Sequence, residues 1–151
     1  MALIHPFYRI VFTWVDPIVS ALTTYTAYTS PAKILASGIP ETMSTYVPQQ
    51  FMVFWHLGGL YSMIAFLSAV LLRYTTDVGV WKIQQAGILL VDLQLILGFY
   101  VAQEAQGRLS LAAWRNEDWF SWVLTSFVVV VRVAFLASRG SAVDHNKKMR
   151  R

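Results

Sequence analysis

Four long apolar stretches dominate the pattern of hydrophobic and polar positions along the chain. They cover about residues 7–28, 51–72, 80–101 and 119–138, and each is close to the roughly 20 residues that a helix needs to cross a bilayer. Continuous apolar runs such as residues 127–131 lack the alternation of a membrane β-strand. Because helices satisfy their own backbone hydrogen bonds in lipid, the pattern predicts an all-α, integral membrane four-helix bundle.

The composition of the chain agrees with this prediction. Hydrophobic residues make up 56% and charged residues 13%, whereas a soluble domain carries about a quarter charged residues. So little charge cannot cover the surface of a soluble domain, and the absence of cysteine excludes a disulfide-stabilised scaffold. The four stretches leave only short connections, so residues 1–151 are expected to form a single transmembrane domain.

Lysine and arginine positions predict the orientation. With four spans, both termini and the loop between the second and third spans share one side with eight of the 12 basic residues. The opposite side holds three, namely Lys33, Arg108 and Arg115. The positive-inside rule therefore places both termini in the cytosol. The basic tail, residues 139–151, ends in KKMRR and resembles a dilysine retrieval signal with methionine at one lysine position, which points to the endoplasmic reticulum.

Four titratable residues interrupt the apolar spans, namely Asp16, His56, Asp92 and Arg132. Such residues are costly in lipid and normally face the interior of a bundle. Helical spacing extends each of them into a polar stripe. The stripes are Asp16, Ser20 and Thr23; Gln49 and His56; Gln85, Asp92 and Gln103; and Ser121, Thr125 and Arg132. We expect the four stripes to face one another in a polar core, with Gly58 and Gly59 allowing close helix packing.

Depth along each span suggests which polar residues meet. Asp16 and Arg132 lie at similar depths from the cytosolic side, roughly 13 and 9 Å at 1.5 Å per residue, and could form a structural ion pair. Asp92 and His56 could meet in the other half of the membrane, with Glu104 near the mouth. Arg132 could instead reach Asp92 through its long side chain. Each pairing could also serve only to hold the helices together.

The residue types restrict the chemistry. With no cysteine and three scattered histidines, the sequence offers no zinc-type ligand set, so we expect neither a metal nor a cofactor. Basic residues flank the spans and leave no footprint for nucleic acid. Metal-free acid–base work in an apolar pocket remains, with Asp92 as acid, His56 as base and Glu104 as a second carboxyl. The expected substrate-binding residues are Trp55, Tyr61, Gln85, Tyr100 and Gln103, of which the aromatic ones could stabilise a developing carbocation through their ring faces.

Several short motifs together carry a family resemblance. They are Asp16-Pro17, Pro31, Pro48-Gln49-Gln50, Leu57-Gly58, LRYTTD at residues 72–77 with Val80-Trp81, Asp92, WRNEDW at residues 114–119 and RVAF at residues 132–135. As a set they resemble a family of small four-span fungal membrane proteins classed only as a domain of unknown function. The resemblance runs over nearly the whole chain, and it implies a filamentous fungus as the source and a place in secondary metabolism. A looser likeness of architecture is to the EXPERA superfamily, which includes sterol isomerases, and to fungal membrane terpene cyclases, which are longer.

The leading hypothesis is therefore a membrane-embedded, redox-neutral isomerase or cyclase that acts on a lipophilic polyketide or terpenoid intermediate. Asp92, His56 and Glu104 would do the chemistry, and Asp16 and Arg132 would hold the bundle. The alternative is a non-catalytic scaffold or a protein that binds or transports a lipophile. Membrane lipids are expected partners in either case, and a second copy of the chain or other pathway enzymes remain open as further partners.

Overall fold

The computed structural model describes residues 4–138, and the regular structure in this part of the chain is all helical, without strands. The elements are α1 (Pro6–Ile10), η1 (Val11–Val15), α2 (Asp16–Thr29), α3 (Pro31–Gly38), η2 (Pro48–Gln50), α4 (Phe51–Phe66), η3 (Leu67–Leu71), α5 (Leu72–Tyr74), α6 (Val78–Ala105), η4 (Leu111–Ala113) and α7 (Asn116–Ala137). Elements η1 and η3 are π-helical, and η2 and η4 are 3₁₀ turns. The predicted basic tail, residues 139–151, lies outside the described residues.

Three helical runs are long and apolar enough to cross a membrane. They are Pro48–Tyr74, Val78–Ala105 and Asn116–Ala137, and large apolar side chains such as Val53, Ile83 and Val130 are exposed on their outer faces. A fourth run, formed by α1, η1 and α2, is more polar because it contains Arg9, Asp16 and several hydroxyl residues. The all-helical class predicted from the sequence is therefore confirmed, and the described residues contain three candidate membrane spans where the sequence predicted four.

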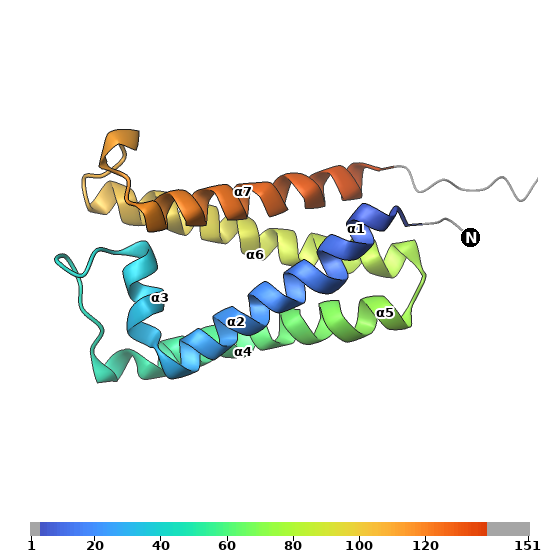
Figure 1. The fold of residues 1–151 in the computed structure, drawn as a ribbon, viewed down its shortest axis with the longest axis horizontal. Helices are drawn as coiled ribbons and strands as arrows, with labels where there is room; N and C mark the ends of the chain where they lie inside the picture. Colours follow the sequence, from blue (N-terminus) through green and yellow to red (C-terminus); the bar gives the residue numbers. More distant parts are fainter. Residues whose placement is uncertain (1–3, 139–151) are drawn as a thin grey trace, which may run out of the picture.

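The long helices pack as two pairs, α2 against α4 and α6 against α7. Figure 1 shows α3 crossing one end of the molecule, while α1, α5 and the end of α7 lie at the other. Gly58 sets the distance between α2 and α4, since a Cβ at this position would collide with Cε1 and Cζ of the Tyr28 ring. Gly59 has open space around it. The predicted close packing is thus confirmed at Gly58 but not at Gly59.

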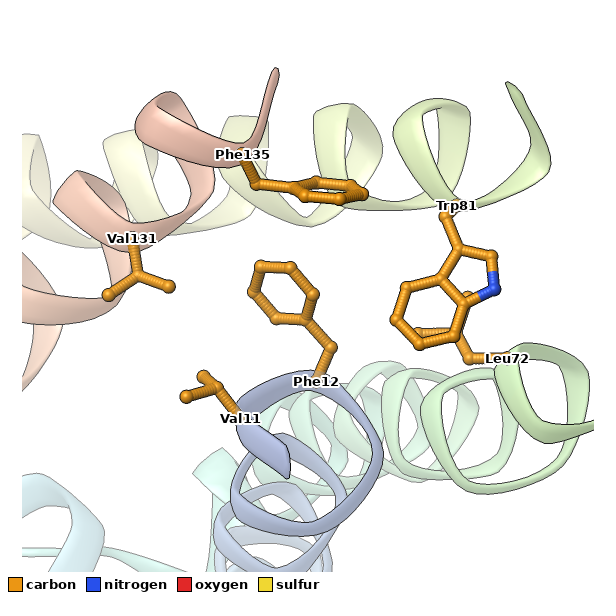
Figure 2. Packing of buried hydrophobic residues seen from close by; sticks show 6 residues of the cluster. All are labelled: Val11, Phe12, Leu72, Trp81, Val131 and Phe135. Carbon is orange, nitrogen blue, oxygen red and sulfur yellow. The ribbon is translucent and has the colours of Figure 1, made fainter. Parts of the chain in front are cut away.

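A hydrophobic cluster closes the end where the N-terminal helix meets α5. Figure 2 shows its members converging from η1, α5, α6 and α7, namely Val11, Phe12, Leu72, Trp81, Val131 and Phe135. The adjacent Lys82 donates hydrogen bonds to the carbonyls of Leu136 and Ser138 at 2.9 and 2.6 Å, which caps the C-terminus of α7. This cluster joins all four helical runs at one end of the bundle.

A polar clamp holds the opposite end. Asp118 at the start of α7 accepts from Arg108 at 2.6 Å and from Arg115 at 3.0 Å. Arg115 also donates to the carbonyl of Ala36 in α3 at 2.9 Å. The clamp therefore ties α3 to the α6–α7 connection, and the middle of the bundle lies between this clamp and the hydrophobic cluster.

Candidate functional site

A local break in the first helical run positions Asp16. The π-helical segment η1 ends at this residue, whose N–H bonds to the carbonyl of Val11. In an α-helix the carbonyl of Thr13 would accept from residue 17, but residue 17 is proline and has no N–H. Arg73 of α5 donates a hydrogen bond to the carbonyl of Thr13, at 2.6 Å. The break is thus supported from a neighbouring helix, and π-helical turns occur frequently at functional sites.

Asp16, Asp92 and Arg132 form one buried charge cluster. A guanidinium nitrogen of Arg132 (Nη2) donates to Oδ2 of Asp16 at 2.9 Å, and Nη1 lies 3.2 Å from Oδ2 of Asp92. The three residues are only 3%, 5% and 7% exposed in the order Arg132, Asp16, Asp92. The contact with Asp92 lacks hydrogen-bond geometry, because Asp92 Oδ2 and Arg132 Nη1 are both left without a hydrogen-bond partner. The two pairings of Arg132 that the sequence left open therefore occur together.

The charge cluster lines a cavity of about 310 Å³ between the two helix pairs. Hydroxyl side chains from α2, α3 and α7 share its wall, namely Ser20, Thr23, Ser37, Ser121 and Thr125. The rest of the wall is apolar or aromatic and includes Val19, Ile34, Leu57, Tyr61, Ile64, Ile88, Val91, Leu95, Phe99, Phe120, Leu124 and Val128. The cavity is an apolar space with one charged side and several hydroxyls.

The polar stripes predicted on the first and last helices do face this cavity. Ser20 and Thr23 lie beside Asp16, and Ser121 and Thr125 lie on the same helix as Arg132. No hydrogen bond within the described residues involves the hydroxyls of Ser20, Ser121 or Thr125. These hydroxyls are therefore available to a molecule in the cavity.

The prediction that the polar stripe of Gln49 and His56 faces the polar core is wrong. The possible contact between His56 and Asp92 does not occur. His56 is exposed, and its Nδ1 lies 2.7 Å from the carbonyl of Met52 on its own helix. The buried face of α4 is set by Phe54 and Gly58, and two residues along a helix turn the side chain by about 200°. His56 consequently points away from the cavity, and Tyr61 is the polar residue that α4 contributes to it.

Three other predicted site residues also lie outside the cavity. Glu104 is exposed, next to the buried Gln103 on α6. Trp55 and Tyr100 are 50% and 45% exposed, and the Trp55 ring packs against Tyr28 and Phe51. Glu104, Trp55 and Tyr100 each lie on the outer face of their helix, because the residue next to each of them in the sequence lies on the inner face.

The two predicted glutamines are buried without lining the cavity. Gln103 accepts a hydrogen bond from the indole of Trp122 at 3.1 Å and so links α6 to α7. Gln85 is fully buried, and neither atom of its amide has a hydrogen-bond partner within residues 4–138. Of the five substrate-binding residues expected from the sequence, only Tyr61 contributes to the cavity wall.

Sequence reasoning missed the aromatic residues Phe99 and Phe120 and the contribution of α3. α3 runs from Pro31 to Gly38 and places Ile34 and Ser37 on the cavity. Pro31 at its first position was the available signal, since proline favours helix starts. Among the described residues, no group of three or more histidine, aspartate or glutamate side chains could hold a metal ion.

Comparison with known protein families gives a match over most of the chain. A family described as a domain of unknown function (DUF7704) matches residues 1–141. Neither a curated protein nor a solved structure matches the chain. The match covers the helical bundle, the charge cluster and the cavity, and its description carries no activity.

Proposed function

Since the chain belongs to the family described as a domain of unknown function (DUF7704), we propose a function from the site itself. The protein is a membrane-embedded isomerase or cyclase that acts on a lipophilic, uncharged molecule, with Asp92 as the proton donor and acceptor. One observation carries this proposal. Two carboxyl groups share a single guanidinium on the wall of an apolar cavity.

Charge balance in this cluster supports proton-transfer chemistry. Asp16 and Asp92 together bring two potential negative charges, and Arg132 brings one positive charge. Uncompensated charge is costly away from water. The cluster is neutral when one carboxyl group holds a proton, and that proton is the one available for transfer.

The contacts distinguish the roles of the two carboxyl groups. Asp16 is held by a hydrogen-bonded ion pair with Arg132, so it acts as the permanent counter-ion. Asp92 contacts Arg132 without a hydrogen bond and lines the cavity. Asp92 therefore carries the transferable proton, whereas His56 and Glu104 take no part.

The proposed step conserves atoms and electrons. Asp92 donates its proton to one carbon of an alkene, forming a C–H bond and a carbocation. The Asp92 carboxylate then removes a proton from an adjacent carbon, which forms a new double bond and restores the acid. Ring closure onto the cation before deprotonation gives a cyclase. The faces of Tyr61, Phe99 and Phe120 on the cavity wall can stabilise the cation.

A substrate would reach this cavity from the bilayer. Val15 and Phe120 line the cavity and are also 37% and 69% exposed, so the cavity wall reaches the outer surface beside η1 and α7. Lipid surrounds this surface in a membrane protein. The polyketide or terpenoid character of the substrate, and a location in the endoplasmic reticulum of a fungus, belong to this proposal and derive from the sequence alone.

We further propose four spans with both termini in the cytosol. The first helical run holds 24 residues and is about 36 Å long at 1.5 Å per residue, enough to cross the bilayer. It extends from the hydrophobic cluster to α3, beside the other long helices (Figure 1). The α3 side holds only three basic residues, Lys33, Arg108 and Arg115, which under the positive-inside rule places this side away from the cytosol.

Deletion and complementation of the gene test the catalytic proposal. In the source organism, loss of the gene should cause a lipophilic precursor to accumulate and an isomeric product to disappear. The wild-type gene and Glu104→Gln should restore the product, whereas Asp92→Asn should reduce it by about 100-fold or more, because general acid–base catalysis is worth 10²–10⁴-fold. Full activity of Asp92→Asn, with normal protein levels, would remove Asp92 from the mechanism.

Binding without turnover is the second candidate function. It is favoured by the position of His56 outside the cavity, because the cavity then lacks the histidine base expected beside Asp92. A lipophile carrier or scaffold predicts an unchanged metabolite profile after deletion, under conditions in which the gene is expressed. It also predicts that a lipophile is recovered with the purified wild-type protein.

A further inference from the structure

Asp92 offers a free acceptor to whatever occupies the cavity. Its Oδ2 atom faces Arg132 without a hydrogen bond, and no hydrogen bond within the described residues involves its Oδ1 atom. The residue is 7% exposed and lines the cavity. Arg132 supplies one positive charge to two carboxyl groups, so a ligand that brings a hydrogen-bond donor and a second positive charge would complete the balance.

We propose that this cavity binds lipophilic amines, with the protonated nitrogen against Asp92 and the hydrocarbon part against the apolar wall. The inference rests on the proposed function in using the same cavity. An amine that enters as a neutral base takes the proton from Asp92, so that an O–H bond breaks and an N–H bond forms. The resulting ammonium ion gives the cluster two positive and two negative charges.

The charge cluster also discriminates against other head groups. A carboxylic acid would add a third carboxyl group beside Asp16 and Asp92, and Arg132 already contacts both. Like charges in a low-dielectric site repel strongly. An alcohol can bond to Asp92 or to the hydroxyls of Ser20 and Thr125, but it brings no charge. The expected order of affinity is therefore amine, then alcohol, then acid.

The shape of the cavity limits the hydrocarbon part. A volume of about 310 Å³ lies at the small end of the range for ligand pockets. Leu57, Leu95 and Val128 provide aliphatic wall, and Phe99 and Phe120 provide ring faces. The ligand class is thus an amine with one medium-length chain or a small ring system. Its positive charge would occupy the position proposed for the carbocation during turnover.

Three probes on one alkyl chain test the inference, namely a dimethylamine, an alcohol and a carboxylic acid. Binding to the purified full-length protein in nanodiscs of zwitterionic lipid is measured by tryptophan fluorescence, and binding to empty nanodiscs is subtracted. Asp92→Asn should weaken amine binding by about 30-fold or more, as expected for loss of a buried charge partner. Glu104→Gln is the matched control, because it removes an exposed carboxyl group outside the cavity, and it should leave amine binding within about twofold.

Comparison of probes on the wild-type protein keeps the inference testable if Asp92→Asn does not fold. A wild-type protein that binds the alcohol or the acid as tightly as the amine would overturn it, as would equal amine binding by folded Asp92→Asn and Glu104→Gln. Because the binding measurement needs no substrate, it tests the amine site independently of the proposed catalytic activity. Amine binding that depends on Asp92, together with an unchanged metabolite profile, supports the amine site and rejects catalysis.

Discussion

At the scale of single residues, Arg132 is the centre of the charge cluster. It contacts both Asp16 and Asp92, whereas neither carboxyl group contacts a second cation among the described residues. Removal of Arg132 leaves two carboxyl groups without a counter-charge. Removal of the Asp16 charge leaves Arg132 and Asp92 as a balanced pair. The cluster is therefore asymmetric, and stability measurements can detect the asymmetry.

Arg132→Met should destabilise the protein more than Asp16→Asn. Removal of one partner from a buried ion pair costs about 3–5 kcal/mol, and Arg132→Met removes the partner of two carboxyl groups at once. Asp16→Asn keeps the shape of the side chain and loses about 1–3 kcal/mol with the charged hydrogen bond. Thermal unfolding in detergent, followed by tryptophan fluorescence, measures both variants. Equal losses of stability in the two variants would show that the contact between Arg132 and Asp92 contributes nothing to stability.

The residue types were enough to predict the members of the charge cluster. Which other polar residues lie near the cluster depends on how each helix is rotated about its axis. Asp16, Asp92 and Arg132 are charged residues inside apolar spans, and the cost of burying them in lipid predicts that they face inward. His56 is less costly at a lipid-facing position, and its Nδ1 lies near a carbonyl of its own helix. Sequence spacing gives the relative angle of two residues on one helix, but it cannot say which face of α4 meets the other helices.

At the scale of elements, the contact between α2 and α4 depends on a missing side chain. Tyr28 lies directly over Gly58, and Thr24 donates a hydrogen bond to the carbonyl of Gly58 at 3.3 Å. Small residues allow helix backbones in membranes to approach in this way. The same contact positions Leu57 and Tyr61 of α4 on the cavity wall.

Gly58→Ala should therefore destabilise the protein, while Gly59→Ala should not. The new methyl group at Gly58 must displace the Tyr28 ring, and overpacking of this kind costs about 1–3 kcal/mol. At Gly59 the methyl group meets open space, and alanine is the better helix former by about 1 kcal/mol. Melting temperatures of the two variants provide the test. A loss at both positions would indicate an effect of the surrounding lipid rather than of the Tyr28 contact.

The long helices were predicted well because membrane thickness and hydrophobicity set their length. The second to fourth stretches, 51–72, 80–101 and 119–138, fall almost entirely within the runs Pro48–Tyr74, Val78–Ala105 and Asn116–Ala137. The short helix α3 was not predicted, because eight residues carry little periodic signal and glycine and proline nearby resemble a turn. Its position over the cavity depends on Arg115 and the carbonyl of Ala36, a contact between residues far apart in the sequence.

At the scale of the whole molecule, the charge cluster gives a reason for the first helical run to cross the membrane. Arg132 lies inside a helix that is long and apolar enough to span the bilayer, and Asp16 must reach the same depth to contact it. Asp16 lies within the first run, whose ends extend toward the two opposite ends of the bundle (Figure 1). If α7 spans the membrane, the first run spans it as well, although its own hydropathy is lower.

Cysteine labelling can distinguish four spans from three, because the chain has no cysteine of its own. The variants His5→Cys, Glu41→Cys and Thr76→Cys place single thiols at three exposed positions. Four spans predict that His5→Cys and Thr76→Cys react with a membrane-impermeant maleimide from the cytosolic side and Glu41→Cys from the other. Three spans, with the first run on the surface, would place His5 with Glu41 instead. In that case Asp16 could not reach Arg132 within the membrane, and the charge cluster would have to be rejected together with the topology.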